Sequence, residues 1–416
     1  MKSLILVLVA IFATFGCNTL PVDISDITIS KIGDKFFLTE PNSHRHIANY
    51  KDPGKAIQSA VGLLINGGTI SLLNGEYVLN QTIYLSKGVS LKGNGRKTLL
   101  KVSDTDSTGV GVMASRLKGV TVSDLSIINA KKPGTVAGIC YDHCGDSEIE
   151  NVYIEGFQKY GIWLRNNSFL CHINNCTSVA NMQANIFTDS LFWSRAGEYM
   201  PNLITNCITY GGYNGIETNK SIVLNIVGCI VHQPQNYGYY IHNVSNSVLL
   251  SGCRTYQTGS DAVWVDKSHE INITGNIFCW SRGKGLVLSG VDWGTVSGNN
   301  IIDSGSERYG GYKGTGDAIG IELQKARCIQ ITGNNIFNWG GQGIMLYAIR
   351  EDSASSNNSI LSNSMNYYIE GSVNSNGKNT VVKDNLGLKS PALNGNPAGP
   401  DPLFDPNLLF RFFEED

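Results

Sequence analysis

A short segment of alternating apolar and polar residues recurs along most of this chain, and this repeat constrains the fold more than any other feature. Its copies include GIWLRN from Gly161, GIETN from Gly215 and GIMLYA from Gly343. Successive copies are mostly 23 or 24 residues apart, with two longer gaps of 30 and 35 residues. Repeats built from two helices need more than about 30 residues per unit, so this period predicts a coil of short strands. The first inward-facing residues of the eight copies are Ile162, Ile186, Ile216, Tyr239, Val263, Leu286, Ile321 and Ile344.

A second repeated segment lies between these copies and ends in Cys or Asn, as in HINNC and TVSGN. In stacked coils this position would form one column, in which Asn side chains hydrogen-bond the turns of neighbouring coils and thiols pack as small hydrophobes. Of the ten Cys, nine remain without Cys17, an odd number, and no CxxC pair occurs. We therefore interpret the column's thiols as free and structural, not as disulfides or metal ligands. The column comprises Cys176, Cys207, Cys229, Cys253, Asn276, Asn299 and Asn334.

Three short strands per coil, stacked in parallel at about 4.8 Å, make an all-β, right-handed, single-stranded parallel β-helix. The sequence resembles the pectate-lyase-like β-helix superfamily over nearly the whole mature chain. KDPGKAIQSAVGLLINGG, from Lys51, resembles that superfamily's opening, an amphipathic helix that covers the strand edges of the first coil. We expect an N-terminal extension over 18–49, the capped β-helix over 50–387 and a Pro-rich tail over 388–416, whose Leu408, Leu409 and Phe410 cover the last coil.

The first 17 residues, MKSLILVLVAIFATFGC, have the early Lys, apolar core and small final residues of an export signal. Gly16-Cys17 resembles a bacterial lipoprotein cleavage site, so either ordinary cleavage or acylation of Cys17 would follow. We expect an exported protein in the periplasm, at the cell surface or outside the cell, with no membrane contact other than this lipid anchor. A net charge of -2 and the lack of a basic run argue against a nucleic-acid partner.

Outward residues of stacked strands also form columns, and two columns on the repeated face carry aromatic and ionisable groups. Aromatic rings beside carboxylates suit sugar rings, whose apolar faces stack on them. Two long insertions flank this face, and loops on a rigid scaffold often carry binding residues. The predicted substrate-binding residues are Trp163, Arg165, Phe187, Trp264, Asp266, and Arg308 and Tyr312 of the second insertion. The first column consists of Trp163, Phe187, Glu217, Tyr240, Trp264, Val287, Glu322 and Met345. The second column consists of Arg165, Asp189, Asn219, His242, Asp266, Ser289, Gln324 and Tyr347.

Within GIETNKS, Lys220-Ser221 resembles the Lys-Ser of the β-helix lyase family that includes chondroitinase B and alginate lyases. That resemblance implies that Lys220 is the base that removes the proton α to a uronate carboxyl. The family places an Arg on the next coil, whereas this chain has Tyr240 and His242 there. The sequence VWVDKS repeats the same spacing at Lys267-Ser268, so the alternative interpretation is that Lys is a common turn residue at this position.

β-Elimination needs a group that neutralises the uronate, a base and an acid near the leaving oxygen. Asp189, Glu217 and Asn219 offer oxygen ligands on adjacent coils for a Ca²⁺ ion that would do the first task. With Lys220 as the base, either Tyr240 or His242 would be the acid. The predicted catalytic residues are Lys220, His242, Tyr240 and Glu217.

Other functions fit the same face. Glu217 and Asp189 would lie roughly 8 Å apart on neighbouring coils, within the span of an inverting glycosidase. A glycoside hydrolase or transglycosidase, an epimerase, or a glycan-binding β-helix without catalysis are therefore alternatives to a secreted lyase acting on an acidic polysaccharide. The sequence leaves the oligomeric state open.

Overall fold

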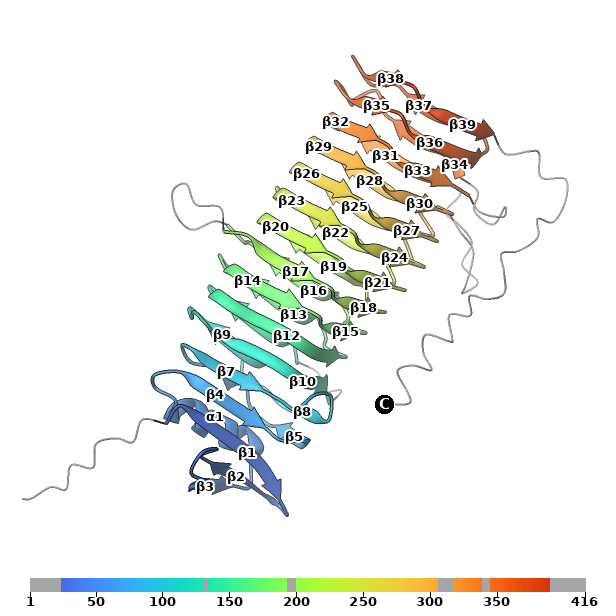
Figure 1. Ribbon diagram of the computed structural model, residues 1–416. Coiled ribbons are helices and arrows are strands. Elements are labelled where there is room, and N and C mark those ends of the chain that lie inside the picture. Colours follow the sequence, from blue (N-terminus) through green and yellow to red (C-terminus); the bar gives the residue numbers. More distant parts are fainter. Residues whose placement is uncertain (1–23, 131–133, 193–199, 306–316, 339–344, 390–416) are drawn as a thin grey trace, which may run out of the picture.

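The protein is an elongated solenoid of stacked coils (Figure 1). The computed structural model describes residues 24–130, 134–192, 200–305, 317–338 and 345–389. Each coil contributes one strand to each of three walls, and consecutive coils pair in parallel along the axis. Wall 1 is a separate sheet of 12 strands, while walls 2 and 3, together with three strands that precede the first coil, form a sheet of 27 strands. The structure thus confirms the predicted parallel β-helix.

Wall 1 carries the first repeated segment of the sequence, of which GIWLRN and GIETN are copies. Its strands are β6 (Ile83–Tyr84), β9 (Val110–Ser115), β11 (Ala137–Asp142), β13 (Tyr160–Arg165), β16 (Ala184–Asp189), β19 (Asn214–Asn219), β22 (Tyr239–His242), β25 (Val263–Asp266), β28 (Leu286–Ser289), β31 (Ala318–Gln324), β34 (Met345–Glu351) and β37 (Gly371–Ser375).

Wall 2 follows wall 1 in each coil. Its strands are β4 (Gly68–Leu72), β7 (Val89–Lys92), β10 (Thr121–Asn129), β12 (Gly145–Glu155), β14 (Phe169–Asn174), β17 (Asn202–Thr205), β20 (Ile222–Val227), β23 (Asn246–Ser251), β26 (His269–Thr274), β29 (Asp292–Ser297), β32 (Arg327–Thr332), β35 (Ser359–Leu361) and β38 (Val381–Lys383).

Wall 3 completes the coil. Its strands are β5 (Gly75–Leu79), β8 (Thr98–Val102), β15 (Thr177–Val179), β18 (Ile208–Tyr210), β21 (Ile230–His232), β24 (Arg254–Tyr256), β27 (Ile277–Cys279), β30 (Asn300–Ile302), β33 (Asn335–Phe337), β36 (Ser364–Tyr368) and β39 (Leu386–Lys389). The long strands β10 and β12 run through both walls 2 and 3, because each pairs with strands of both.

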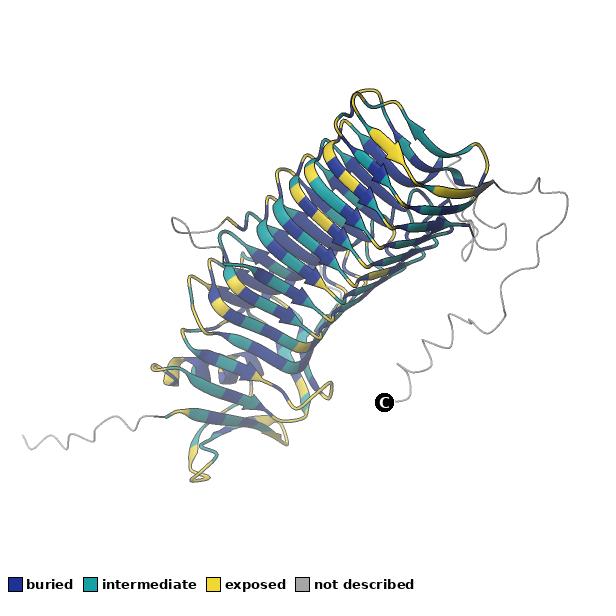
Figure 2. Cartoon of the chain, turned by 45° about the horizontal axis from the view of Figure 1, so that its top comes forward, coloured by how far each residue is buried: buried dark blue, intermediate teal, exposed yellow. Residues whose placement is uncertain are grey.

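The hydrophobic core runs along the axis between the walls, and buried residues alternate with more exposed ones along most strands of walls 2 and 3 (Figure 2). Wall 1 departs from strict alternation at its repeated glycine. A Cβ added to Gly215 would lie 2.4 Å from Val231 Cγ1 and 2.5 Å from the carbonyl oxygen of Gly238, so Gly215 faces the core like the neighbouring Ile216. The residue before this glycine, Asn214, is consequently directed outward.

The Cys and Asn column predicted from the sequence is a buried ladder between walls 2 and 3. Asn299 Oδ1 accepts hydrogen bonds from the backbone N–H and the side-chain amide of Asn276, at 3.0 and 2.9 Å. Asn299 Nδ2 donates to Ile273 O at 3.0 Å and to Asn334 Oδ1 at 2.9 Å. The four cysteines of the column are free and buried, which confirms their predicted structural role.

The predicted cap is helix α1 (Pro53–Leu63), which begins after Asp52. The Asp52 carboxylate accepts a hydrogen bond of 3.1 Å from the Lys55 N–H. Pro53 occupies the first turn, where a backbone N–H would have no partner within the helix, so the missing N–H of proline costs the helix nothing. Its apolar side, including Ile57 and Ala60, is buried against the first coil. None of the described helices is long and apolar enough to cross a membrane.

Three further strands precede the cap. β1 (Asp26–Ile32) pairs in parallel with β4 and antiparallel with β2 (Lys35–Thr39), which in turn pairs with β3 (His46–Tyr50). At the other end, the last coil exposes Val381, Val382 and Leu386. The expected cover for it, Leu408 to Phe410, lies outside the described residues, as does the export signal.

The predicted register is wrong for the last copy of the repeat. Ile321 pairs with Ile349 and Glu322 with Arg350, so AIRED continues the columns, not GIMLYA. The cause is a register irregularity between Ala318 and Ile319, which a fixed spacing cannot anticipate. Met345 and Tyr347 therefore leave the two predicted columns, and Arg350 joins the first.

The ladder generates a stability prediction. Asn299→Ala would leave the buried Asn276 N–H and the Ile273 carbonyl without their partners, at a cost of about 1–3 kcal/mol for each buried group. We expect a clear drop in the urea midpoint of the full chain. Asn272→Ala, which alters an exposed amide of the preceding coil, is the matched control. Equal midpoints for the two variants would contradict the structural role of the ladder.

Candidate functional site

The two columns predicted on wall 1 are in register from β13 to β28. Trp163, Phe187, Glu217, Tyr240, Trp264 and Val287 pair in succession. Arg165, Asp189, Asn219 and His242 form the parallel column, and Asp266 pairs with Ser289 farther along. The outer surface of wall 1 therefore brings together side chains from six successive coils.

A third column on the same face was missed by sequence reasoning. It consists of the residues directly before the repeated small residue, which point outward because that small residue faces the core. Tyr160, Ala184 and Asn214 pair in register, and backbone hydrogen bonds continue the column through Tyr237, Asp261 and Lys284. The glycine that occupies a fixed place in six of the eight copies was the signal that could have found it.

Glu217 and His242 form a buried pair at the centre of this face. Glu217 Oε1 lies 3.2 Å from His242 Nε2, and its Oε2 accepts a hydrogen bond of 2.8 Å from Asn214 Nδ2. Asn243 Nδ2 lies 2.9 Å from His242 Nδ1 and also donates to Asn219 Oδ1 at 2.9 Å. With Asn243 donating to Nδ1, the imidazole carries its proton on Nε2 and donates it to the carboxylate. Glu217 is thus a group that orients His242, and its exposure of 5 % corrects the expectation of an open carboxylate.

An aromatic cluster adjoins this pair. The Tyr240 and His242 rings are stacked, with centroids 4.0 Å apart and an interplanar angle of 6°. Tyr237 lies between Tyr240 and Trp264, at centroid distances of 4.9 and 5.5 Å. Burial raises the pKa of the Tyr240 phenol, and the nearby carboxylates of Asp266 and Glu217 raise it further. The phenol therefore keeps its proton and can donate it.

The second aromatic group of the face is packed more tightly than expected. Phe187 is 5 % exposed and stacks on Tyr160 at a centroid distance of 4.4 Å. Trp163 is half-buried, and the Arg165 guanidinium lies 4.3 Å from its ring centre. Arg165 also donates to Asp142 at 3.0 and 2.8 Å. Phe187 is therefore a packing residue and not an open platform, because the ring of the coil before it covers its face.

Lys220 lies at the turn that ends β19. It is exposed, has a φ of 49°, and its backbone N–H donates to the His242 carbonyl at 3.1 Å. Lys267 and Lys325 occupy the same place after β25 and β31, with φ of 46° and 52°. The left-handed conformation is thus a property of this turn throughout the solenoid, and Lys220 is one of several residues that adopt it.

A charged cluster continues the face toward the C-terminus. Arg350 Nε donates to Glu322 Oε1 at 2.7 Å, and its two terminal nitrogens contact Asp317 at 2.6 and 2.7 Å. Lys284 forms an ion pair with Glu322 and lies 3.6 Å from Asp317. The backbone N–H of Lys284 donates to the buried carboxyl of Asp261. Both oxygens of Glu322 are engaged, so this cluster ties three coils together.

The three predicted calcium ligands are hydrogen-bonded to protein groups. Both oxygens of Glu217 accept from Asn214 or His242, and Asp189 Oδ1 accepts from Asn219 Nδ2 at 2.7 Å and from Ser190 Oγ at 3.0 Å. In the described part of the chain, no three His, Cys, Asp or Glu residues gather as a metal site. This arrangement does not fit an oxygen cage for Ca²⁺. The calcium ion stays a prediction, and no step below depends on it.

Arg308 and Tyr312, predicted to bind substrate, lie outside the described residues, as does most of the first insertion.

The charged cluster generates a pH prediction. Burial raises the pKa of Asp261 to about 6, against the opposing effects of the Lys284 N–H and ammonium. A carboxyl whose pKa is higher in the folded state holds its proton more firmly there, so stability falls as pH rises from about 4 to about 6. Asp261→Asn should therefore raise the unfolding free energy at pH 8, on the order of 2–3 kcal/mol, and little at pH 4. A gain in urea midpoint that is equal at both pH values would contradict this assignment.

Comparison with solved structures gives relatives of the same fold at low identity. The A-module of the Azotobacter vinelandii mannuronan C-5 epimerase AlgE6 has a TM-score of 0.63 and 15% identity, covering 81% of this chain and 95% of that one. A mannuronic acid specific family 6 polysaccharide lyase from human gut microbiota has a TM-score of 0.56 and 12% identity, covering 82% and 90%. Tailspike protein 3 of bacteriophage CBA120 has a TM-score of 0.58 and 16% identity, covering 84% of this chain and 62% of that one.

A search of curated protein sequences finds no significant match to the chain. The family model described as the right handed beta helix region matches residues 137–317 and 245–387. These two matches together cover more than half of the 416 residues and include all of wall 1 from β11 onward. The sheet topology of the three walls agrees with this match. The chain therefore belongs to the right-handed β-helix family.

Proposed function

We propose that this protein is an exported polysaccharide lyase that cleaves a uronate-containing glycan by β-elimination on the outer surface of wall 1. The observation that carries the proposal is the grouping of Glu217, His242 and Tyr240. A buried carboxylate fixes the imidazole, and a phenol that keeps its proton is stacked on that imidazole. They provide a positioned base and an acid, two of the groups that a proton abstraction followed by loss of an alkoxide requires.

The proposed reaction begins with His242. Its Nε2–H is held by Glu217, so the lone pair of Nδ1 is the basic site, and a bound substrate would take the place of the Asn243 amide there. Nδ1 takes the proton from the carbon next to the uronate carboxyl. The electron pair of that C–H bond forms a carbon–carbon double bond as the neighbouring C–O bond breaks. Tyr240 donates its phenolic proton to the leaving oxygen, which gives one unsaturated sugar end and one ordinary sugar end.

Lys220 was predicted as the base. Its exposed ammonium could equally neutralise the carboxylate of a substrate bound beside Glu217, His242 and Tyr240. We favour His242 over Lys220 for proton abstraction because Glu217 holds the His242 ring in place, and a base must first be positioned within hydrogen-bond reach of the proton. We therefore assign Lys220 to charge neutralisation. Trp264 and Tyr237 offer half-buried aromatic surface next to Tyr240 for stacking on sugar rings.

Two of the structural relatives support a uronate substrate. The epimerase and the family 6 lyase are named for mannuronan and mannuronic acid, both of uronate chemistry. The alternative of a hydrolase that uses Glu217 and Asp189 has less support, because both oxygens of Glu217 are engaged and its side chain is buried. A glycan-binding coil without catalysis is distinguished by the assay below, in which it would yield no product.

The experiment is a screen of alginate, pectate, chondroitin and hyaluronan, read by the ultraviolet absorbance of the unsaturated product. On the substrate found, His242→Ala and Tyr240→Phe should each lower kcat/KM by at least about a hundredfold, as expected for loss of a proton-transfer group. His242→Gln gives a variant of closer size if the alanine variant is unstable. New reducing ends without ultraviolet absorbance would contradict the lyase proposal in favour of a hydrolase.

The chain offers a geometrically matched control for these variants. His232 and Tyr256 on wall 3 form a second stacked His–Tyr pair, with centroids 4.9 Å apart and an interplanar angle of 14°. His232→Ala and Tyr256→Phe should leave kcat/KM unchanged. Equal losses at the two pairs would show that the effects come from the stability of the solenoid, not from chemistry on wall 1.

A separate prediction concerns Lys220. Lys220→Ala should lower kcat/KM on the uronate substrate at least about tenfold, because a cation that stabilises charge in the transition state is lost. Lys267→Ala removes a Lys from the same turn two coils away, with the same backbone conformation, and should have no such effect. Equal activities of the two variants would assign Lys220 to the turn alone.

A further inference from the structure

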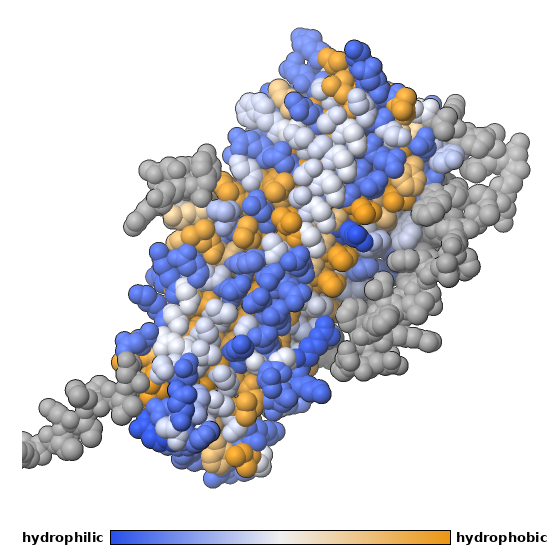
Figure 3. Space-filling view, in the orientation of Figure 1, coloured by the Kyte–Doolittle hydropathy of each residue, from blue (hydrophilic) through white to orange (hydrophobic). Residues whose placement is uncertain are grey.

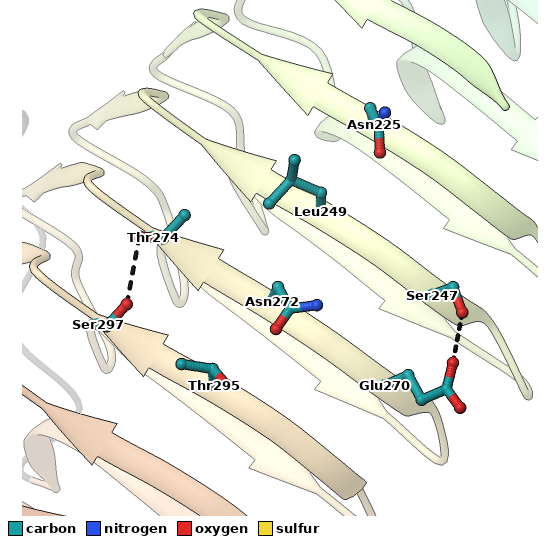
Figure 4. A pocket seen from close by; sticks show the side chains of 8 residues that line it. All are labelled: Asn225, Ser247, Leu249, Glu270, Asn272, Thr274, Thr295 and Ser297. Atoms are coloured by element: carbon teal, nitrogen blue, oxygen red, sulfur yellow. Dashed lines mark hydrogen bonds between the residues drawn. The ribbon is translucent and has the colours of Figure 1, made fainter.

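Wall 2 carries a groove that the proposed lyase site does not use. It has a volume of about 450 Å³ and crosses the strands β20, β23, β26 and β29. The outward side chains of these strands stand in rows across four successive coils (Figure 4). The groove is lined by Asn225, Ser247, Leu249, Glu270, Asn272, Thr274, Thr295 and Ser297.

The lining is rich in neutral hydrogen-bonding groups. In the part of the chain that the structure describes, the amides of Asn225 and Asn272 and the hydroxyl of Thr295 make no hydrogen bond to protein. Ser297 Oγ donates to Thr274 Oγ1 at 3.2 Å, and Ser247 donates to the Glu270 carboxylate. No Lys or Arg belongs to the lining, whose one charged residue is the acidic Glu270. The groove therefore suits an uncharged ligand with many hydroxyls and disfavours an anionic one.

Trp293 lies beside this lining and continues the row of Ser247 and Glu270 onto β29. It precedes Thr295 by two positions on β29 and so lies on the same side of the strand. Because His269 pairs with Asp292, Trp293 is the neighbour of Glu270 on the next coil. Both residues have a left-handed backbone conformation, with φ of 55° for Trp293 and 52° for Glu270. Trp293 is 59 % exposed, and its only described ring contact is with His269, at a centroid distance of 6.3 Å. This large apolar ring is not explained by packing.

We infer that this groove, with Trp293 at its rim, binds neutral saccharide units of a glycan. An exposed indole offers the flat apolar surface on which a pyranose ring stacks, and amides and hydroxyls beside it match the sugar hydroxyls. The spacing of the coils lets successive sugar units meet equivalent rows of side chains. Figure 3 shows a face of the solenoid on which hydrophilic, weakly polar and hydrophobic side chains are mixed along its length. This site lies on a different wall from Glu217 and His242 and takes a ligand of different charge.

The test is titration calorimetry of the full chain with cellohexaose, maltohexaose and mannohexaose, each uncharged, and with an oligomannuronate of the same length. At least one neutral hexasaccharide should bind to the unmodified protein. Trp293→Ala and Asn272→Leu should each weaken that binding at least tenfold. Because both side chains are exposed, neither change is expected to prevent folding.

Tyr367→Ala is the control, since Tyr367 is 46 % exposed in a coil near the C-terminal end, away from the groove. It should leave the affinity for the neutral sugar unchanged. The inference is overturned if none of the three neutral sugars binds, or if binding survives both Trp293→Ala and Asn272→Leu. The assay measures binding alone, so its outcome is independent of whether wall 1 cleaves a uronate.

Discussion

Parallel hydrogen bonding between consecutive coils is the interaction on which the rest of this structure depends. Each coil satisfies its backbone groups only through the coils above and below it, so every coil must have strands in the same places. The demand is greatest at the tight turn between walls 2 and 3, where backbone groups are buried. There the Asn ladder supplies the missing partners, as when Asn299 accepts from the Asn276 backbone and donates to the Ile273 carbonyl. In the earlier coils Cys fills the same position, and the backbone N–H of Cys229 lies 3.4 Å from Cys253 Sγ.

The same constraint gives the outer surfaces their character. A side chain that points outward from one coil lies beside its counterpart on the next, so function can be assembled from residues about 23 positions apart. On wall 1, this brings Glu217, Tyr240 and His242 together and places the charges of Glu322 and Arg350 farther along the same face. On wall 2, the same stacking makes parallel rows of polar side chains, one of which reaches Trp293 through Ser247 and Glu270. One scaffold thus presents surfaces of different chemistry on its separate walls.

Much of the fold and part of the site could be predicted from the sequence. The period, the cap from Lys51 and the ladder were all predictable, because each is a local pattern that recurs or begins at a recognisable residue such as Asp52. The pairing of Phe187 with Glu217 and of Asp189 with Asn219 also follows from aligning the repeated segments, although 30 residues separate these two copies. The prediction failed where backbone irregularities enter: the shift at Ala318 moved Arg350 into the column, and the inward glycine turned Asn214 and Tyr237 outward.

The repeated segments alone reveal which residues share the two predicted columns up to Glu322 and Gln324, because strand alternation sets direction and alignment of the copies sets register. How deep each of those residues lies, and with what it bonds, depends on the packing of neighbouring coils. Glu217 could be predicted to point outward, but its burial under Asn214 and His242 depends on side chains from its own strand and from the next coil. Burial and hydrogen bonding are properties of several coils packed together, so no single copy of the repeat contains them.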